Sequence, residues 1–162
     1  MKLLFLCTHN ACRSILCEAI FNHLGNGTLQ AKSAGSAPAN DVHPLTLQNL
    51  QAAGYKTEGL SSKHSDALAD FSPDAVITVC DSAAKESCPV YFGPAVKAHW
   101  GLPDPSKMTG SEQEIEEVFQ ALISRIELLA HQFLAAKINF TGPNITLKNE
   151  LNRIGEINNG AI

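Results

Sequence analysis

The sequence contains no apolar stretch that approaches the length of a membrane span, and it has no excess of basic residues. Its 162 residues include 12 Lys and Arg against 16 Asp and Glu, which gives a formal net charge of −4. A membrane-spanning helix needs about 20 apolar residues, and this charge creates no general field that attracts nucleic acid or an anionic membrane. We therefore predict no membrane and no nucleic-acid partner, and a local site for any anion that binds.

A secretory signal is also lacking. The opening MKLLFLC has a short apolar run but not the long apolar region and small-residue cleavage site of a signal peptide. The cysteines are five, an odd number, at Cys7, Cys12, Cys17, Cys80 and Cys88. We therefore expect a cytoplasmic protein, in which static disulfides are rare and cysteines serve chemistry, metal binding or packing.

No internal repeat or linker-like segment interrupts the chain, and short apolar runs alternate with helical patterns. Runs at 2–7, 29–34, 74–80 and 95–100 predict strands, and helical spacing of apolar residues predicts helices at 14–24, 44–53 and 112–136. Uniformly apolar strands that alternate with helices indicate an α/β fold, with a parallel sheet covered on both faces. Gly25 is the predicted stop of the helix at 14–24. We predict a catalytic domain at 1–136 and a C-terminal extension at 137–162, which forms a short helix or is partly disordered, because Gly155 and the final Asn-Asn-Gly argue for fraying.

The segment CTHNACRS places a thiol where the first strand ends and an arginine where the first helix begins. Ligands bind beyond the carboxyl ends of parallel strands, and a helix N-terminus adds converging amides and a favourable dipole. Arg13 contributes a planar set of donors for a tetrahedral oxyanion. The same surroundings favour the thiolate of Cys7, and Ser14 is placed to donate a hydrogen bond to it. Asn10 tolerates a left-handed backbone and is expected to tie the loop down.

These features predict nucleophilic attack by Cys7 on a tetrahedral oxyanion. The alternative is a purely structural role, in which Cys7 is buried at the end of a strand and Arg13 lies on the surface. We expect packing roles for Cys12 and Cys17, although a secondary redox role for Cys12 stays open. The predicted oxyanion-binding loop consists of Thr8, His9, Asn10, Ala11, Cys12, Arg13 and Ser14.

CTHNACRS, together with SAGS at 33–36 and HWGLPDPS at 99–106, resembles the low-molecular-weight phosphotyrosine phosphatase superfamily, and within it the arsenate reductases. The resemblance runs from Lys2 to about Ala136. It implies a flavodoxin-like three-layer sandwich with a four-stranded parallel sheet and an oxyanion loop after the first strand. It also implies Cys7 as nucleophile, Arg13 as oxyanion binder and Asp104 as general acid, where an ordinary turn residue is the alternative.

The segment VITVC80 followed by SC88P favours the reductase branch of this superfamily. Cys80 ends a strong apolar strand, so it is expected at the same sheet edge as Cys7. The implied chemistry is a thiol–disulfide relay in which Cys80 attacks the Cys7 sulfur and Cys88 then attacks Cys80. The segment between Cys80 and Cys88 must move for this, because a disulfide brings two sulfurs to about 2 Å. A zinc pair completed by His64 or His99 is disfavoured by the spacing, and we predict no metal.

Two departures from the family pattern shape the expected partners. The spacing from Cys80 to Cys88 is one residue longer than in thioredoxin-coupled members, so glutaredoxin or glutathione is an alternative to thioredoxin as the external reductant. Some members bind potassium through an acidic residue in the stretch that here reads LSSKHSD. Lys63 takes that position, and its ammonium is predicted to replace the cation. We expect a monomer with no bound cofactor.

Two other functions remain open on the sequence. A phosphatase acting on tyrosine or small phosphoesters would use Cys7, Arg13 and Asp104 but would not need Cys80 or Cys88. The only tyrosines, Tyr55 and Tyr91, lie away from the acid segment, where such phosphatases commonly hold a phenyl ring. A non-enzymatic regulator would bind an oxyanion or sense oxidants through its thiols. Weak phosphatase activity is expected even of an arsenate reductase, because arsenate and phosphate share shape and charge.

Overall fold

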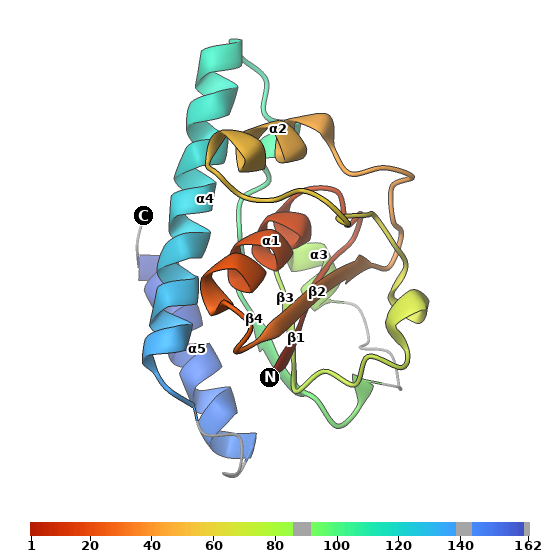
Figure 1. Ribbon diagram of the computed structural model, residues 1–162, viewed down its shortest axis with the longest axis vertical. Coiled ribbons are helices and arrows are strands. Elements are labelled where there is room, and N and C mark those ends of the chain that lie inside the picture. Colours follow the sequence, from red (N-terminus) through yellow and green to blue (C-terminus); the bar gives the residue numbers. More distant parts are fainter. Residues whose placement is uncertain (86–91, 139–143, 161–162) are drawn as a thin grey trace.

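A computed structural model describes residues 1–85, 92–138 and 144–160 of the chain. Four parallel strands form one sheet, as predicted, and their order is β2-β1-β3-β4. Figure 1 shows the sheet beside the long helix α4, with α5 packed along its lower half. The strands are β1 (Lys2–Cys7), β2 (Gln30–Gly35), β3 (Ala75–Thr78) and β4 (Val96–His99). The helices are α1 (Arg13–Gly25), α2 (Pro44–Ala52), α3 (Asp81–Ala84), α4 (Glu112–Ala135) and α5 (Asn144–Gly160), with short 3-10 turns η1 (Ser65–Leu68) and η3 (Pro105–Lys107).

The core lies on both faces of the sheet, so the central strands β1 and β3 are apolar on both sides, whereas the edge strands β2 and β4 include polar residues. The larger cluster packs α1, α4 and α5 against one face, around Phe5, Phe21 and Trp100. The smaller cluster covers the other face and includes Leu4, Phe71 and the η1 residue Leu68. This arrangement explains the uninterrupted apolar runs, because a strand buried on both faces has no polar side to show.

The helix ends follow the sequence signals with one exception. Ser111 and Glu114 form a reciprocal capping box at the start of α4. Gly25, which the sequence predicts as the stop of α1, is instead its last helical residue, and the left-handed cap is Asn26 with a φ of 44°. Gly25 is needed for a different reason, since a Cβ there would lie 2.5 Å from the Leu29 side chain.

Helix α5 lies in the C-terminal extension and packs on β4 and α4. Leu147, Leu151 and Ile154 are buried, whereas Ile145 is 58% exposed. The glycine at 155 does not end the helix, which continues to Gly160. Within the described residues, no helix combines the length and apolar character that crossing a membrane requires.

The end of β2 packs tightly against the loop that follows β1. Gly35 pairs with Cys7 in the sheet, and its amide donates to the Lys63 carbonyl oxygen at 2.9 Å. A Cβ on Gly35 would lie 2.5 Å from the backbone oxygen of Thr8 and 3.1 Å from Asn10. Since backbone cannot swing aside as a flexible side chain can, any larger residue must displace this loop.

We expect Gly35→Ala to lower the free energy of unfolding by about 1–3 kcal/mol, as overpacking of a filled interior does. It should also slow alkylation of Cys7 by iodoacetamide at neutral pH, because the loop around the sulfur shifts. Denaturant unfolding and peptide mass spectrometry measure the two effects. Gly59→Ala is the control: a left-handed backbone (φ 80°) makes it costly, but no atom lies within 4 Å of the new Cβ. If Gly35→Ala left Cys7 reactivity unchanged, the loop would not depend on this contact.

Candidate active site

The candidate site begins where β1 ends. Cys7 is the last residue of β1, and α1 starts at Arg13 after a five-residue loop. The Sγ atom of Cys7 accepts the Asn10 amide at 3.1 Å and lies 2.9 Å from Ser14 Oγ. Asn10 Nδ2 donates to the same Ser14 oxygen at 2.8 Å. The serine oxygen already accepts from Asn10, so its own hydrogen is free to point at the sulfur. All three side chains are almost completely buried.

The carbonyl groups of the loop are turned outward. The oxygens of Thr8, His9 and Ala11 accept backbone amides of Ala37, Ala39 and His43 at 2.9–3.0 Å. In a planar trans peptide the N–H of the next residue points the opposite way. The amides of residues 9, 10 and 12 therefore face the interior of the loop, and the amide of residue 10 does bind the sulfur. This is the arrangement of donors that an oxyanion requires.

Asn10 supports the loop by its conformation and by its side chain. Its φ of 47° lies in the left-handed region, as the sequence predicts. Its Oδ1 accepts the backbone amide of Lys63 at 2.9 Å, and Ser62 Oγ donates to the His9 oxygen at 3.0 Å. The loop is thereby fixed from the segment 61–63 as well as from within.

Arg13 extends from the first turn of α1 to the segment that carries Asp104. Its Nη1 donates to the Leu102 oxygen at 3.1 Å and its Nη2 to Asp104 Oδ2 at 3.3 Å. Both charged side chains are largely buried, at 16% and 17% exposure. Asp104 is the N-cap of η3, and its other oxygen accepts the amide and the hydroxyl of Ser106. The structure thus brings Cys7, Arg13 and Asp104 to one edge of the sheet.

Cys80 lies at the same edge. It follows β3, which pairs with β1, and it is buried at 3% exposure as the N-cap of α3. Its Sγ accepts the Ala83 amide at 3.4 Å and lies 3.6 Å from Thr8 Oγ1. Thr8 is the neighbour of Cys7, so Cys7 and Cys80 lie at the same ends of two adjacent strands, with Thr8 in contact with Cys80. Cys88 lies outside the described residues.

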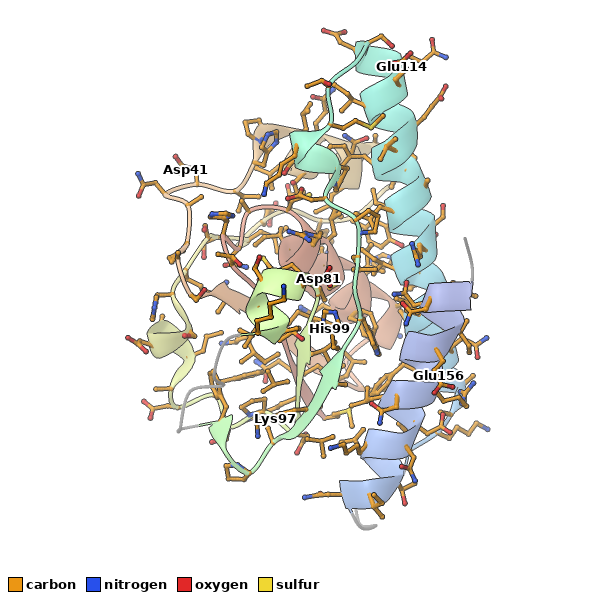
Figure 2. All side chains as sticks on the ribbon, turned by 180° about the vertical axis from the view of Figure 1, so that it is seen from behind. Asp41, Asp81, Lys97, His99, Glu114 and Glu156 are labelled. Atoms are coloured by element: carbon orange, nitrogen blue, oxygen red, sulfur yellow. The ribbon has the colours of Figure 1, made fainter. Side chains whose placement is uncertain are left out.

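A contact that the sequence does not reveal ties the first residue of α3 to β4. Asp81 Oδ1 lies 3.2 Å from His99 Nε2, and the other ring nitrogen of His99 lies 2.9 Å from Thr78 Oγ1. Figure 2 shows Asp81 and His99 near each other, one on α3 and one at the end of β4. The pair is largely exposed, so it adds little stability, but it fixes the residue next to Cys80.

Two other thiols belong to the interior. Burial raises the pKa of Cys12 to about 12 and raises that of Cys17 well above its ordinary value. Both stay protonated at neutral pH, and a protonated thiol is a poor nucleophile. These environments support the packing roles expected for both cysteines.

Lys63 points to a buried carboxylate beneath the loop. Its ammonium lies 3.7 Å from Glu18 Oε2 and donates to the Ser61 oxygen at 2.9 Å. Ser33 Oγ also hydrogen-bonds to Glu18. Burial raises the pKa of Glu18 and lowers the pKa of Lys63, and in each case the partner's charge opposes the effect of burial. Sequence reasoning missed Glu18, although an acidic residue amid the apolar positions of α1 was a signal for it.

Metal ligands do not cluster in the part of the chain that the structure describes: no three His, Cys, Asp or Glu side chains come together there in a way that could hold an ion.

The sequence profile of one family, described as low molecular weight phosphotyrosine protein phosphatase, matches residues 2–140. The chain belongs to this family. Its curated relatives include an arsenate reductase of Shouchella clausii, 33% identical over 126 residues that cover 75% of this chain and 86% of the relative. Similarity to this relative places the chain with the arsenate reductases of the family.

Solved structures agree with this placement. A structure described as an arsenate reductase in the phosphate binding state has 26% sequence identity to this chain and a TM-score of 0.63. The match covers 80% of this chain and 96% of the chain in that structure. The thioredoxin-dependent arsenate reductase of Corynebacterium glutamicum has 30% sequence identity to this chain and a TM-score of 0.58. The match covers 79% of this chain and 59% of the chain in that structure. The expected α/β fold with a four-stranded parallel sheet is confirmed. The family match ends at residue 140, before α5 begins.

Proposed function

We propose that this protein reduces arsenate to arsenite, with Cys7 as the nucleophile and Cys80 as the second thiol. The observation that carries the proposal is the placement of both sulfurs at one sheet edge, with Thr8 in contact with Cys80. A phosphatase of the same family needs only the first sulfur. The similarity of this chain to arsenate reductases supports the same proposal.

In the first step, the Cys7 thiolate attacks arsenic in the bound oxyanion. An S–As bond forms and the bond from arsenic to a hydroxyl group of hydrogen arsenate breaks, and the departing hydroxyl takes a proton from the carboxylic acid form of Asp104 to leave as water. Arg13 and the inward-facing amides of residues 9, 10 and 12 hold the remaining oxygens and their charge. Arg13 already bonds to Asp104 at 3.3 Å, so the acid lies within reach of the oxyanion that the arginine binds.

In the second step, the Cys80 thiolate attacks the Cys7 sulfur. The S–S bond forms and the S–As bond breaks, and the electron pair of that bond stays on arsenic. Arsenic(V) thereby becomes arsenic(III), which leaves as arsenite, while the two sulfurs are oxidised to a disulfide. Cys80 must leave its contact with the Ala83 amide to do this. The cost is small, since α3 spans only four residues.

We assign the third step to Cys88 on the sequence alone. Its thiolate attacks Cys80, the Cys7 thiolate leaves, and an external dithiol then reduces the Cys80–Cys88 disulfide. We propose thioredoxin as that reductant, with glutaredoxin or glutathione as the alternative. The relay needs cysteines kept reduced, which suits the cytoplasm that the sequence predicts.

We expect Cys88→Ser to abolish sustained arsenate-dependent NADPH oxidation in the presence of thioredoxin and thioredoxin reductase, because Cys7 stays trapped in its disulfide. Hydrolysis of p-nitrophenyl phosphate should continue, since that reaction needs no second thiol. Cys17→Ala is the matched control, because it removes a buried thiol of α1 that lies outside the loop, and it should keep both activities.

Replacing thioredoxin by glutaredoxin and glutathione in the same assay identifies the reductant. Arsenate turnover by Cys88→Ser at the wild-type rate would contradict the relay. Ester hydrolysis without any arsenite production by the wild type would make the protein a phosphatase.

We also propose that the Lys63 ammonium replaces a bound potassium ion beneath the loop. Its contacts with Glu18 and the Ser61 oxygen support this, because a carboxylate and a carbonyl oxygen are groups that a cation binds. The carboxylate is largely buried, so it needs a positive partner.

The melting temperature of the wild type should therefore be the same in potassium chloride and in choline chloride at equal ionic strength. Lys63→Ala should lower the free energy of unfolding by roughly 2–4 kcal/mol, because it leaves Glu18 buried without its partner. Lys56→Ala, which removes an exposed lysine, is the control. A large potassium-dependent rise in the wild-type melting temperature would show that an ion still binds.

A further inference from the structure

Helix α5 holds two consecutive residues of the segment that leads from β4 to Asp104. Trp100 Nε1 donates to the Leu151 oxygen at 2.9 Å, and Asn158 Nδ2 donates to the Gly101 oxygen at 3.0 Å. Both bonds are donated by side chains that are almost completely buried, with Trp100 at 0% and Asn158 at 1% exposure. The helix is therefore hydrogen-bonded at two points to the start of residues 100–104, which we call the acid segment.

Close approach of α5 to this segment depends on a glycine. A Cβ on Gly155 would lie 3.0 Å from Trp100 Cδ1 and 3.3 Å from the His99 oxygen. A larger residue would push the helix away from the segment. The glycine that the sequence suggests as a weak point of the helix is instead the position where α5 fits against Trp100.

Trp100 and Gly101, which α5 contacts, lie directly before the residues of the candidate active site. Gly101 shares its peptide with Leu102, whose oxygen accepts Arg13 Nη1 at 3.1 Å and whose amide donates to the Val79 oxygen at 3.1 Å. Asp104 follows two residues later and binds the other Arg13 nitrogen. A shift of the Gly101 carbonyl would thus move both acceptors that orient the guanidinium.

The far end of α5 is itself anchored. The backbone oxygen of Asn158 accepts Arg125 Nη2 from α4. Among the described residues, Asn158 Oδ1 has no hydrogen-bond partner although it is buried. An unpaired buried amide oxygen costs stability, so a leucine would serve simple packing better. The donor group of this amide accounts for the choice of asparagine.

We propose that Asn158 is a positioning residue for the acid segment, and that α5 sets the placement of Asp104 and Arg13 through the Gly101 carbonyl. The proposal rests on the function proposed above for Arg13 and Asp104. Asn158 acts through Gly101 and Leu102 and does not itself touch the oxyanion. It lies beyond residue 140, so the role belongs to the part of this chain that the family match does not include.

The test is single-turnover arsenite formation by the full chain, measured against arsenate concentration. Asn158→Leu should lower the maximal rate by roughly 10-fold, since a small misplacement of a catalytic group has a large effect on rate. The arsenate concentration for half-maximal rate should change less than the rate does. Alkylation of Cys7 by iodoacetamide should be unaffected, because the hydrogen bonds around the sulfur come from Asn10 and Ser14 and not from α5.

Three further variants keep this test decisive. Asn152→Leu, at an exposed position of the same helix, is the matched control and should retain the wild-type rate. Gly155→Ala should reproduce the loss if Asn158→Leu does not fold, with a shifted fluorescence of Trp100, the single tryptophan. Asp104→Asn measures the proposed acid separately, and a wild-type rate there would overturn the acid assignment and with it the need for positioning.

A lower melting temperature for Asn158→Leu with an unchanged maximal rate would overturn the proposal and leave α5 a purely stabilising helix. A rate loss that is matched by an equal loss of Cys7 alkylation would also overturn it, because the effect would then come from general loosening of the site.

Discussion

The Cys7 sulfur accepts a hydrogen bond from the Asn10 amide at 3.1 Å and lies 2.9 Å from Ser14 Oγ. Both contacts require a tightly closed loop. The loop can close only because Asn10 adopts a left-handed backbone and because Gly35 leaves room beside it. Its carbonyls are bound from outside, which turns the amides of residues 9, 10 and 12 toward the interior of the loop. In the proposed reaction, these donors stabilise both the attacking sulfur and the oxygens of the oxyanion.

Parallel pairing then gives this sulfur a partner. β1 and β3 are neighbours in the sheet and both end at the same edge, so the residues after them meet whatever their separation in the sequence. The strand ends bring Cys80 beside Thr8 across 72 residues of chain. The same topology places β4 next to β3 and leads the chain through Trp100 toward Asp104. One sheet edge therefore holds Cys7, Cys80, Arg13 and Asp104, to which we assign the roles of nucleophile, second thiol, oxyanion binder and acid.

Local patterns sufficed to predict much of this arrangement. Apolar runs and helical spacing indicated the strands and helices, and CTHNACRS indicated the loop, because each signal is contained in a few adjacent residues. Contacts between distant segments were not predictable in this way. Glu18 beneath Lys63, His99 beside Asp81 and Asn158 on Gly101 depend on how elements pack, and no spacing rule connects those positions. The glycine at 155 was misleading for the same reason, since its close contact with Trp100 exists only in the folded chain.

The most direct measurement is a time course of disulfide formation during one turnover of reduced protein with arsenate and no external reductant, by rapid acid quench and peptide mapping. We expect a Cys7–Cys80 disulfide that appears first and is replaced by Cys80–Cys88, with one arsenite released per chain. Arsenite release while Cys7 never leaves the thiol state, or a Cys80–Cys88 disulfide that forms at the same rate in Cys7→Ser, would contradict it.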